Sequence, residues 1–139
     1  MKYLLLILSV SFLFFEGFSQ HKPGKSLYHH RKVLNSKLFE GLATYYHNKF
    51  HGKRMSNGEI YRKEKFTAAS NSIPLNRWIK VTNLRNKHWV IVKVTDRMHH
   101  KNKLLLDLSM AAAQKLRMVG GGKIKVKAEV LSNYHPPGK

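Results

Sequence analysis

The sequence contains no cysteine. The fold therefore uses no disulfide bonds, and we expect no lipid anchor on an N-terminal cysteine. Acidic residues are scarce as well, because 7 Asp and Glu stand against 26 Lys and Arg, for a formal net charge of +19 at pH 7. A small domain with so large a positive surplus should associate with polyanions.

Long hydrophobic runs are also rare, and the one that stands out lies at the N-terminus. Lys2 precedes an apolar run over residues 4–15, and the small residues Gly17 and Ser19 follow it. The run is shorter than the roughly 20 residues of a membrane-spanning helix, so it is typical of a secretory signal peptide rather than an uncleaved anchor. We expect a signal peptide over residues 1–19 and an exported protein, periplasmic or secreted. An exported basic protein meets an anionic wall or outer-membrane surface, so we expect it to bind that surface and not nucleic acid.

The length of 139 residues and a hydrophobic content of 42% suit one domain with a modest core. Residues 20–39 hold five basic residues, no acid before Glu40 and only a weak apolar pattern, which predicts a basic, loosely ordered lead-in. We expect the folded domain over residues 40–131 and a tail over residues 132–139.

Short strands and a single helix are predicted within the folded domain. Ser109 is a good N-cap for a helix over residues 110–118, which the glycines at 120–122 should end. The two runs 78–84 and 88–95 flank a three-residue loop and should pair antiparallel. Alternation of lysines with apolar residues over 123–130 predicts a strand with one charged and one buried face. Together with strand-like runs at 41–46 and 66–69, these elements indicate a mainly β fold, a small closed barrel.

One strand ends on a carboxylate. Val90, Val92 and Val94 alternate with other side chains in the period-2 pattern of a half-buried strand, and Asp96 follows directly. An acid fixed at a strand end is well placed for chemistry in a cleft, although capping a turn is the commoner duty of such a residue.

Eight short segments together resemble the rare lipoprotein A (RlpA) family. In order they are Gly41-Leu42-Ala43-Thr44-Tyr45-Tyr46, Phe50-His51-Gly52-Lys53-Arg54, Ser56-Asn57-Gly58-Glu59, Phe66-Thr67-Ala68-Ala69, Ile73-Pro74-Leu75, Val81-Thr82-Asn83-Leu84, Val94-Thr95-Asp96-Arg97 and Leu106-Asp107-Leu108-Ser109-Met110-Ala111-Ala112-Ala113. The resemblance implies a six-stranded double-psi β-barrel with one short helix. It also implies an endolytic peptidoglycan lytic transglycosylase that cleaves peptide-stripped glycan strands, leaves anhydro-muramyl ends and needs no cofactor.

The resemblance also implies a site. Asp96 corresponds to the acid/base and Glu59 to a supporting acid, and the two roles could be reversed. The implied substrate-binding residues are Tyr46, His51, Asn57, Ser70 and Arg97. Asp107, two residues before the helix cap, is expected to brace that turn instead of working in the cleft. Implied partners are peptidoglycan glycan strands and cell-division proteins, and we expect a monomer.

The chain departs from the family pattern at three places. His47 stands where the family usually has glycine, Met98-His99 replaces Gly-Pro, and Ser70 replaces a histidine that follows Thr-Ala-Ala. Ser70 keeps a second hypothesis open, a non-catalytic, expansin-like module that grips wall glycan without cutting it. A third, resting on charge alone, is a cationic protein that binds anionic surfaces or nucleic acid. The nine histidines lack metal-ligand spacing, so no metal site is predicted.

Overall fold

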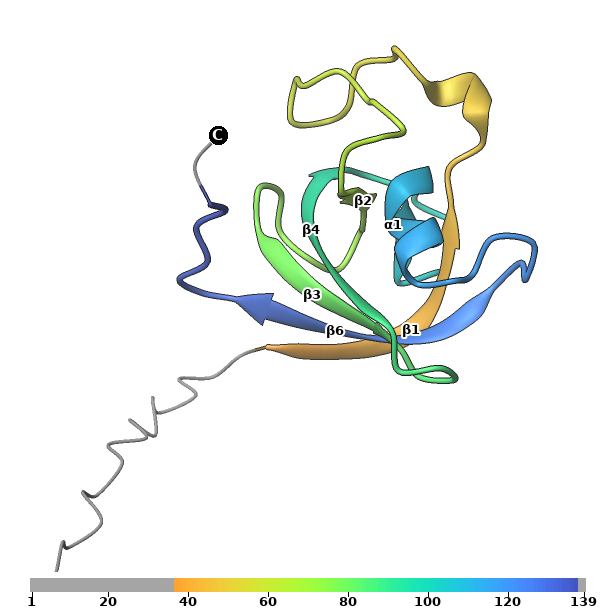
Figure 1. Ribbon diagram of the computed structural model, residues 1–139. Coiled ribbons are helices and arrows are strands. Elements are labelled where there is room, and N and C mark those ends of the chain that lie inside the picture. Colours follow the sequence, from red (N-terminus) through yellow and green to blue (C-terminus); the bar gives the residue numbers. More distant parts are fainter. Residues whose placement is uncertain (1–36, 138–139) are drawn as a thin grey trace, which may run out of the picture. The chain divides into compact units, whose positions relative to one another are not determined.

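A computed structural model describes residues 37–137 of the chain (Figure 1). The predicted signal peptide and nearly all of the basic lead-in lie outside these residues. The described part contains six strands, one 3-10 turn and one α-helix, in the order β1 (Leu38–Tyr45), η1 (Asn48–Phe50), β2 (Thr67–Ala69), β3 (Trp78–Asn83), β4 (Trp89–Asp96), β5 (Leu106–Leu108), α1 (Met110–Lys115) and β6 (Ile124–Leu131).

The strands close into a barrel in the order β1-β5-β2-β4-β3-β6. Two neighbouring pairs, β1–β5 and β2–β4, run parallel, and the other pairs of the barrel run antiparallel. This mixture requires connections that cross the barrel ends instead of simple hairpins. The closed double-psi β-barrel predicted from the sequence motifs is confirmed, and within residues 37–137 the barrel strands leave no sheet edge open.

Alternating side chains build the core. β3 and β4 form the predicted antiparallel hairpin, with Ile79 opposite Val92 and Val81 opposite Val90, all buried. On β6 the lysines point outward while Val126 and Ala128 are buried, as the alternation predicted. Burying an apolar side chain of this size stabilises the fold by about 1.5–3 kcal/mol, so a one-residue register slip is strongly disfavoured.

The helix begins where it was predicted to begin and ends earlier. The Ser109 hydroxyl accepts a hydrogen bond from the Ala112 amide at 3.3 Å, which is the predicted N-cap. The helix was expected to reach Met118, but it ends at Lys115 with Leu116 as C-cap, because Arg117 adopts a left-handed backbone conformation with φ of 52°. The glycines at 120–122 follow this turn and do not cause it.

Three further features differ from the expectation. β1 begins at Leu38, inside the segment assigned to the lead-in, and pairs with β6 from its first residue. β5 has only three residues, too few for a recognisable alternation. In the predicted tail, the ring of Tyr134 packs 5.3 Å from that of Trp78. None of the helices within residues 37–137 is long and apolar enough to cross a bilayer.

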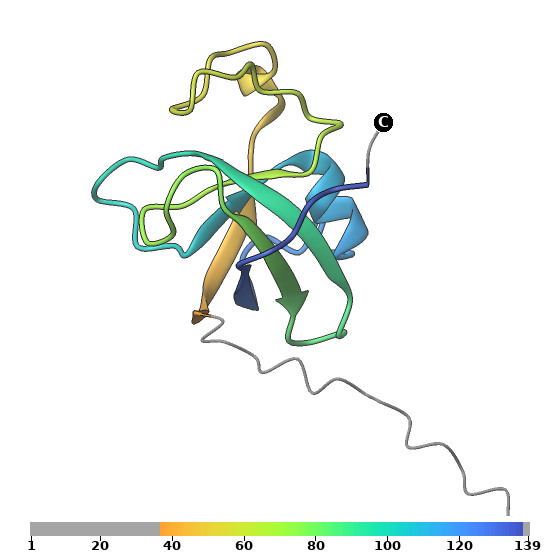
Figure 2. The same ribbon diagram turned by 90° about the vertical axis from the view of Figure 1, so that its left-hand side faces the viewer.

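The long segment between β1 and β2 rises over one end of the barrel, and the β3–β4 hairpin closes the other end (Figures 1 and 2). The Met55 amide donates to the carbonyl of Glu59, and the Asn57 amide donates to the carbonyl of Thr95 at the end of β4. These bonds fasten the segment to the strand that carries Asp96. The candidate site forms beneath it.

Candidate active site

A cleft of about 420 Å³ lies between the β1–β2 segment and the barrel end. Its walls combine two carboxylates with aromatic, basic and thioether side chains. The lining residues are Tyr46, Phe50, Lys53, Arg54, Met55, Tyr61, Asp96, Arg97, Met98, His99, Asn102 and Asp107. A partly apolar cleft with a few converging polar groups is the usual form of a binding or active site.

Asp96 is held in the cleft by four hydrogen bonds. Its Oδ2 accepts from the Tyr46 hydroxyl at 2.7 Å. Its Oδ1 accepts from the amide and hydroxyl of Ser56 at 2.8 and 2.6 Å, and from the Arg97 amide at 2.8 Å. Every partner is a donor, so the site is built for a carboxylate and not for a carboxylic acid.

The charge state of Asp96 follows from these bonds. Partial burial is the largest single influence and favours the neutral form, but the hydrogen bonds from Ser56, Tyr46 and Arg97 together outweigh it and lower the pKa of Asp96 below its ordinary value. Asp96 is therefore ionised at neutral pH. Such a group stabilises positive charge and is a poor proton donor.

Asp107 is the second carboxylate of the cleft. Ala69 of β2 pairs with Asp96 of β4 on one side and with Asp107 of β5 on the other. Residues that share a row of a sheet project from the same face, and two strand spacings put their Cα atoms about 10 Å apart. The side chain between them, the methyl group of Ala69, is buried and packs with Tyr46 and Tyr61.

The environment of Asp107 is the opposite of that of Asp96. Burial, and then repulsion from the Asp96 charge, raise the pKa of Asp107 to about 6. Its buried Oδ1 has no hydrogen-bond partner among residues 37–137. Two neighbouring acids whose pKa values are moved apart in this way can divide the roles of proton donor and anion. Asp107 was expected to brace the helix turn, but its side chain lines the cleft and its Oδ1 accepts no hydrogen bond from that turn.

Aromatic packing fixes the position of the Tyr46 hydroxyl, which donates to Asp96. The ring of Tyr46 lies 4.8 Å from that of Tyr61 and 5.5 Å from that of Phe50, in tilted and edge-on arrangements. Together with Met55 and Ala69 these residues form a small core of their own beside the main one. Burial and the hydrogen bond to Asp96 raise the pKa of Tyr46 far above its usual value, so its hydroxyl stays a donor. The rings position the hydroxyl and also present apolar surface to the cleft.

Of the residues assigned to the site from sequence, Asp96, Tyr46 and Arg97 line this cleft. Arg97 is tied down, because its Nη1 donates to the carbonyls of Ser70 and Ile73, the latter at 2.7 Å. The guanidinium therefore serves the adjacent loop as well as the cleft wall.

Glu59, His51 and Asn57 do not line the cleft. Glu59 forms an ion pair with Lys93 at 2.7 Å, which is the first cause of its lowered pKa, and lines a different surface pocket. His51 is exposed and its Nδ1 accepts from the Lys63 amide. The Asn57 side chain accepts from the Glu59 amide and donates to Asn76, so it shapes the turn. Their local motifs gave the residue types but not the direction of the side chains.

Ser70 is fully buried, which contradicts its assignment to substrate binding. Its hydroxyl donates to the carbonyl of Leu105 at 2.9 Å and accepts from the amides of Ser72 and Ile73 at 3.3 Å. The serine that replaces the family's histidine thus holds a turn together. A histidine at this position requires the surrounding loop to move, because the smaller serine side chain is already fully buried.

Ser70→Ala should lower the free energy of unfolding by about 1–3 kcal/mol, since the substitution leaves a buried carbonyl and two amides without their partner. Urea unfolding of the variant and the parent measures this difference. An unchanged free energy of unfolding would contradict this structural role of Ser70.

Sequence reasoning missed Asp107, Tyr61, Lys53 and His99. For Asp107 a signal was present, because the acid stands between Leu106 and Leu108 in a run that is otherwise apolar, and both leucines are fully buried. A lone carboxylate in such a run projects to the opposite face of its strand. Within residues 37–137 no group of three or more histidine or acidic side chains is arranged to hold a metal ion.

The barrel and its cleft define a class of protein, the double-psi β-barrels that carry acidic residues in a groove at one end of the barrel. The family model for lytic transglycolases matches residues 38–128. The chain belongs to the lytic transglycolase family, which agrees with the RlpA resemblance of its motifs.

Two relatives of known name share this domain. The endolytic peptidoglycan transglycosylase RlpA of Haemophilus influenzae is 43% identical over 96 residues, which are 69% of this chain and 33% of the relative. The protein of the same name from Pasteurella multocida is 40% identical over 92 residues, 66% of this chain and 31% of the relative. The chain thus spans about a third of the length of these relatives.

Among solved structures, a mutant expansin of Clavibacter michiganensis in complex with cellohexaose superposes with a TM-score of 0.59. The match covers 72% of this chain and 53% of the expansin at 19% sequence identity. At that identity the likeness establishes the fold alone.

Proposed function

We propose that this protein is an exported lytic transglycosylase that cleaves peptidoglycan glycan strands. The observation that carries the proposal is the pair Asp96 and Asp107, whose pKa values move in opposite directions within one aromatic-lined cleft. Relatives named endolytic peptidoglycan transglycosylases support the substrate class. Export to the periplasm or medium follows from that substrate.

In this mechanism Asp107 is the acid/base. Its protonated carboxyl donates to the glycosidic oxygen as the bond from that oxygen to the anomeric carbon breaks. The resulting Asp107 carboxylate then takes the proton of the sugar's own C6 hydroxyl. At the same time the C6 oxygen bonds to the anomeric carbon, which closes the anhydro ring. The proton taken equals the proton given, so no water is consumed and the residue ends as it began.

Asp96 supplies the negative charge that this reaction needs. The transition state resembles an oxocarbenium ion, and a carboxylate fixed by four donors faces it without having to reorganise. The acid/base role assigned to Asp96 from sequence is therefore proposed for Asp107, and Asp96 is proposed as the stabilising anion.

Glu59 and His51, two further residues of the sequence assignment, contact the glycan outside the reacting bond in this proposal. Glu59 lies on the turn that begins at Ser56 and pairs with Lys93 of β4, three residues before Asp96. A glycan strand that leaves the cleft over this turn would contact Glu59 and His51, which are both exposed. The monomeric state and the cell-division partners stay predictions.

Glycan cleavage should be fastest below about pH 6 and fall as pH rises further, by about tenfold per unit once Asp107 is ionised. The direction follows from the donor role, because only the protonated carboxyl can give up a proton. On the acid side the rate should fall only below the ordinary range of an aspartate, since the pKa of Asp96 is lowered. Initial rates on peptide-stripped glycan across pH 3–9 measure this profile. A rate that climbs from pH 6 to 8 would contradict the assignment.

The second candidate function is a glycan-binding module without catalysis, which the expansin-like fold favours. The two hypotheses differ in turnover. A protein that retains denuded glycan at every pH and releases no fragments is the binding module.

A further inference from the structure

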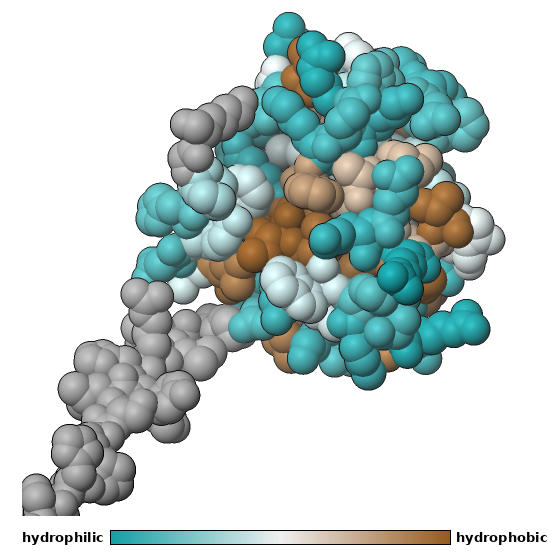
Figure 3. Space-filling model, viewed as in Figure 1, coloured by the Kyte–Doolittle hydropathy of each residue, from teal (hydrophilic) through white to brown (hydrophobic). Residues whose placement is uncertain are grey.

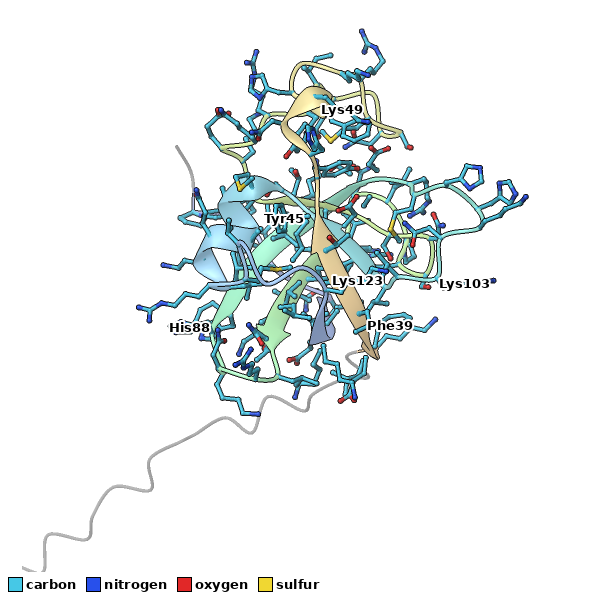
Figure 4. The ribbon with its side chains drawn as sticks, turned by 90° about the vertical axis from the view of Figure 1, so that its right-hand side faces the viewer. Phe39, Tyr45, Lys49, His88, Lys103 and Lys123 are labelled. Atoms are coloured by element: carbon cyan, nitrogen blue, oxygen red, sulfur yellow. The ribbon has the colours of Figure 1, made fainter. Side chains whose placement is uncertain are left out.

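A second pocket, the hairpin-end pocket, lies away from the Asp96 cleft. It has a volume of about 540 Å³ and is lined by the β3–β4 hairpin, the turn after α1 and the start of β6. It shares no lining residue with the cleft. In Figure 4, Lys49 of the segment over the cleft and His88 of the hairpin lie at opposite ends of the barrel.

The charge of this pocket has one sign. Its lining contains Arg85, Arg117, Lys123 and Lys125, all exposed, and no acidic residue. Within the described part of the chain the only ion pair is Lys93 with Glu59, so the four cations of the pocket have no carboxylate partner there. Four uncompensated positive charges around one hollow attract a multiply charged anion.

The walls of the pocket are held in place. The side-chain amides of Asn83 and Asn86 both donate to the carbonyl of Leu116, at 3.1 and 3.0 Å, and tie the hairpin to the end of α1. The next residue, Arg117, has a left-handed backbone at the position after a helix cap where glycine is favoured. An arginine is thus placed at the pocket despite the strain of its backbone.

Exposed apolar side chains lie on or next to the segments that carry the cations. Val119, in the turn after α1, is 50% exposed. Trp89, the first residue of β4, is 52% exposed, and the Lys80 ammonium lies 4.9 Å from the centroid of its ring. Leu42 is 41% exposed and pairs with Lys125 across β1 and β6. A cation cluster edged by tryptophan and aliphatic side chains matches the two layers of a membrane surface, where phosphates lie above acyl chains. A soluble polyanion offers nothing for these apolar side chains to contact.

We propose that the hairpin-end pocket binds the phosphate groups of anionic phospholipids, with Trp89, Val119 and Leu42 entering the interface. The protein would then rest on a membrane surface by one end of the barrel while the cleft at the other end faces away from it. This inference does not depend on glycan cleavage.

Vesicle binding by the full-length protein tests the proposal. In the pocket variant Arg85, Arg117, Lys123 and Lys125 are all replaced by Gln. In the matched control, Gln replaces four exposed basic residues that line neither the hairpin-end pocket nor the Asp96 cleft. They are Arg62, Lys63, Lys101 and Lys103. Affinity for phosphatidylglycerol vesicles at 0.15 M salt should fall roughly 100-fold or more in the pocket variant and less than roughly tenfold in the control. Equal losses in the two variants would overturn the proposal, since charge alone would then explain binding.

Two further readouts separate the lipid from other phosphates. In a Trp78→Phe background Trp89 is the sole tryptophan, and its emission should shift to shorter wavelength with phosphatidylglycerol but not with phosphatidylcholine vesicles. No shift with either lipid would contradict interfacial insertion. Pocket-dependent binding of pyrophosphate or of a single-stranded oligonucleotide that exceeds vesicle binding would overturn the lipid assignment. Matching thermal unfolding midpoints for both variants show that the fold is intact.

Discussion

Asp107→Asn should reduce glycan cleavage by about 10²-fold or more and at the same time make the protein more stable at pH 8. The loss of rate follows because asparagine keeps the shape of the side chain but has no carboxyl proton to donate. The gain in stability follows because a buried carboxylate beside the charge of Asp96 is replaced by a neutral group. A catalytic acid held in an unfavourable environment lowers the stability of its own fold.

The effect of Asp107→Asn on stability should depend on pH. Because the pKa of Asp107 is raised to about 6 in the folded protein, the folded state binds more protons than the unfolded state between about pH 4 and 6, and stability falls as pH rises through this window. Discounted for partial exposure, the substitution should raise the free energy of unfolding at pH 8 by about 1–2 kcal/mol. At pH 4, where the parent carboxyl is protonated, the gain should vanish.

Urea unfolding at both pH values, together with rates on denuded glycan, measures the two effects. Glu40→Gln is the matched control, since it removes one exposed carboxylate on the outside of β1 and should change neither quantity appreciably. A destabilised Asp107→Asn variant with a normal rate would restore the turn-bracing role and contradict the mechanism.

Asp96→Asn should also cost about 10²-fold in rate, for a different physical reason. The substitution removes the negative charge that faces the oxocarbenium-like transition state but leaves an oxygen for the Ser56 and Arg97 donors, so the fold should persist. Stability at neutral pH should fall by about 1–3 kcal/mol, because donors that served a charged acceptor are left with a neutral one. The pKa of Asp96 lies below its ordinary value, so this contribution is present above about pH 4 and disappears in the parent as pH falls further.

A second readout distinguishes Asp96→Asn from Asp107→Asn. Without the Asp96 charge one of the two causes of the raised pKa of Asp107 is gone, so the residual rate should begin to fall at a lower pH than in the parent. Glu59→Gln, which alters an ion pair outside the cleft, should cost less than about tenfold and leave the pH profile in place. An unshifted profile in Asp96→Asn would mean that the two carboxylates do not interact.

The sequence was sufficient for the parts of the fold that have strong local periodicity. The valines of β4 and the lysines of β6 alternate over eight-residue strands, and Ser109 marks the start of α1, so these elements could be placed from pattern and capping alone. The closed double-psi arrangement followed from the motif resemblance. The local pattern alone indicated only a small barrel.

The site was harder to predict because pairing between strands that are distant in the sequence assembles it. Asp96 and Asp107 become neighbours only because β2 inserts between β4 and β5, and a three-residue strand such as β2 carries no pairing information of its own. Glu59 and Ser70 show the complementary error. Their motifs were correct, but the side chains turn to Lys93 and to the carbonyl of Leu105, partners that lie on other strands or loops and leave no trace in local sequence.

The composition also predicted a general property of the surface without predicting where on the surface it is found. The net charge of +19 predicted binding to anions, but it could not locate the hairpin-end pocket, which draws its cations from three separate segments. Nor did it indicate the apolar patch on the face that carries β3 and β4, where hydrophilic side chains surround brown surface in Figure 3. Phe66, Trp78 and Ile91 line the pocket on this side of the barrel, beside Glu59.

The chemical form of the new glycan end tests the central claim most directly. Mass spectrometry of peptide-stripped glycan after incubation with the protein at pH 5 should show fragments that end in anhydro-muramyl residues, and the Asp107→Asn variant should yield about 10²-fold fewer of them. Hydrated reducing ends in their place, or equal yields of anhydro ends from the parent and Asp107→Asn, would contradict it.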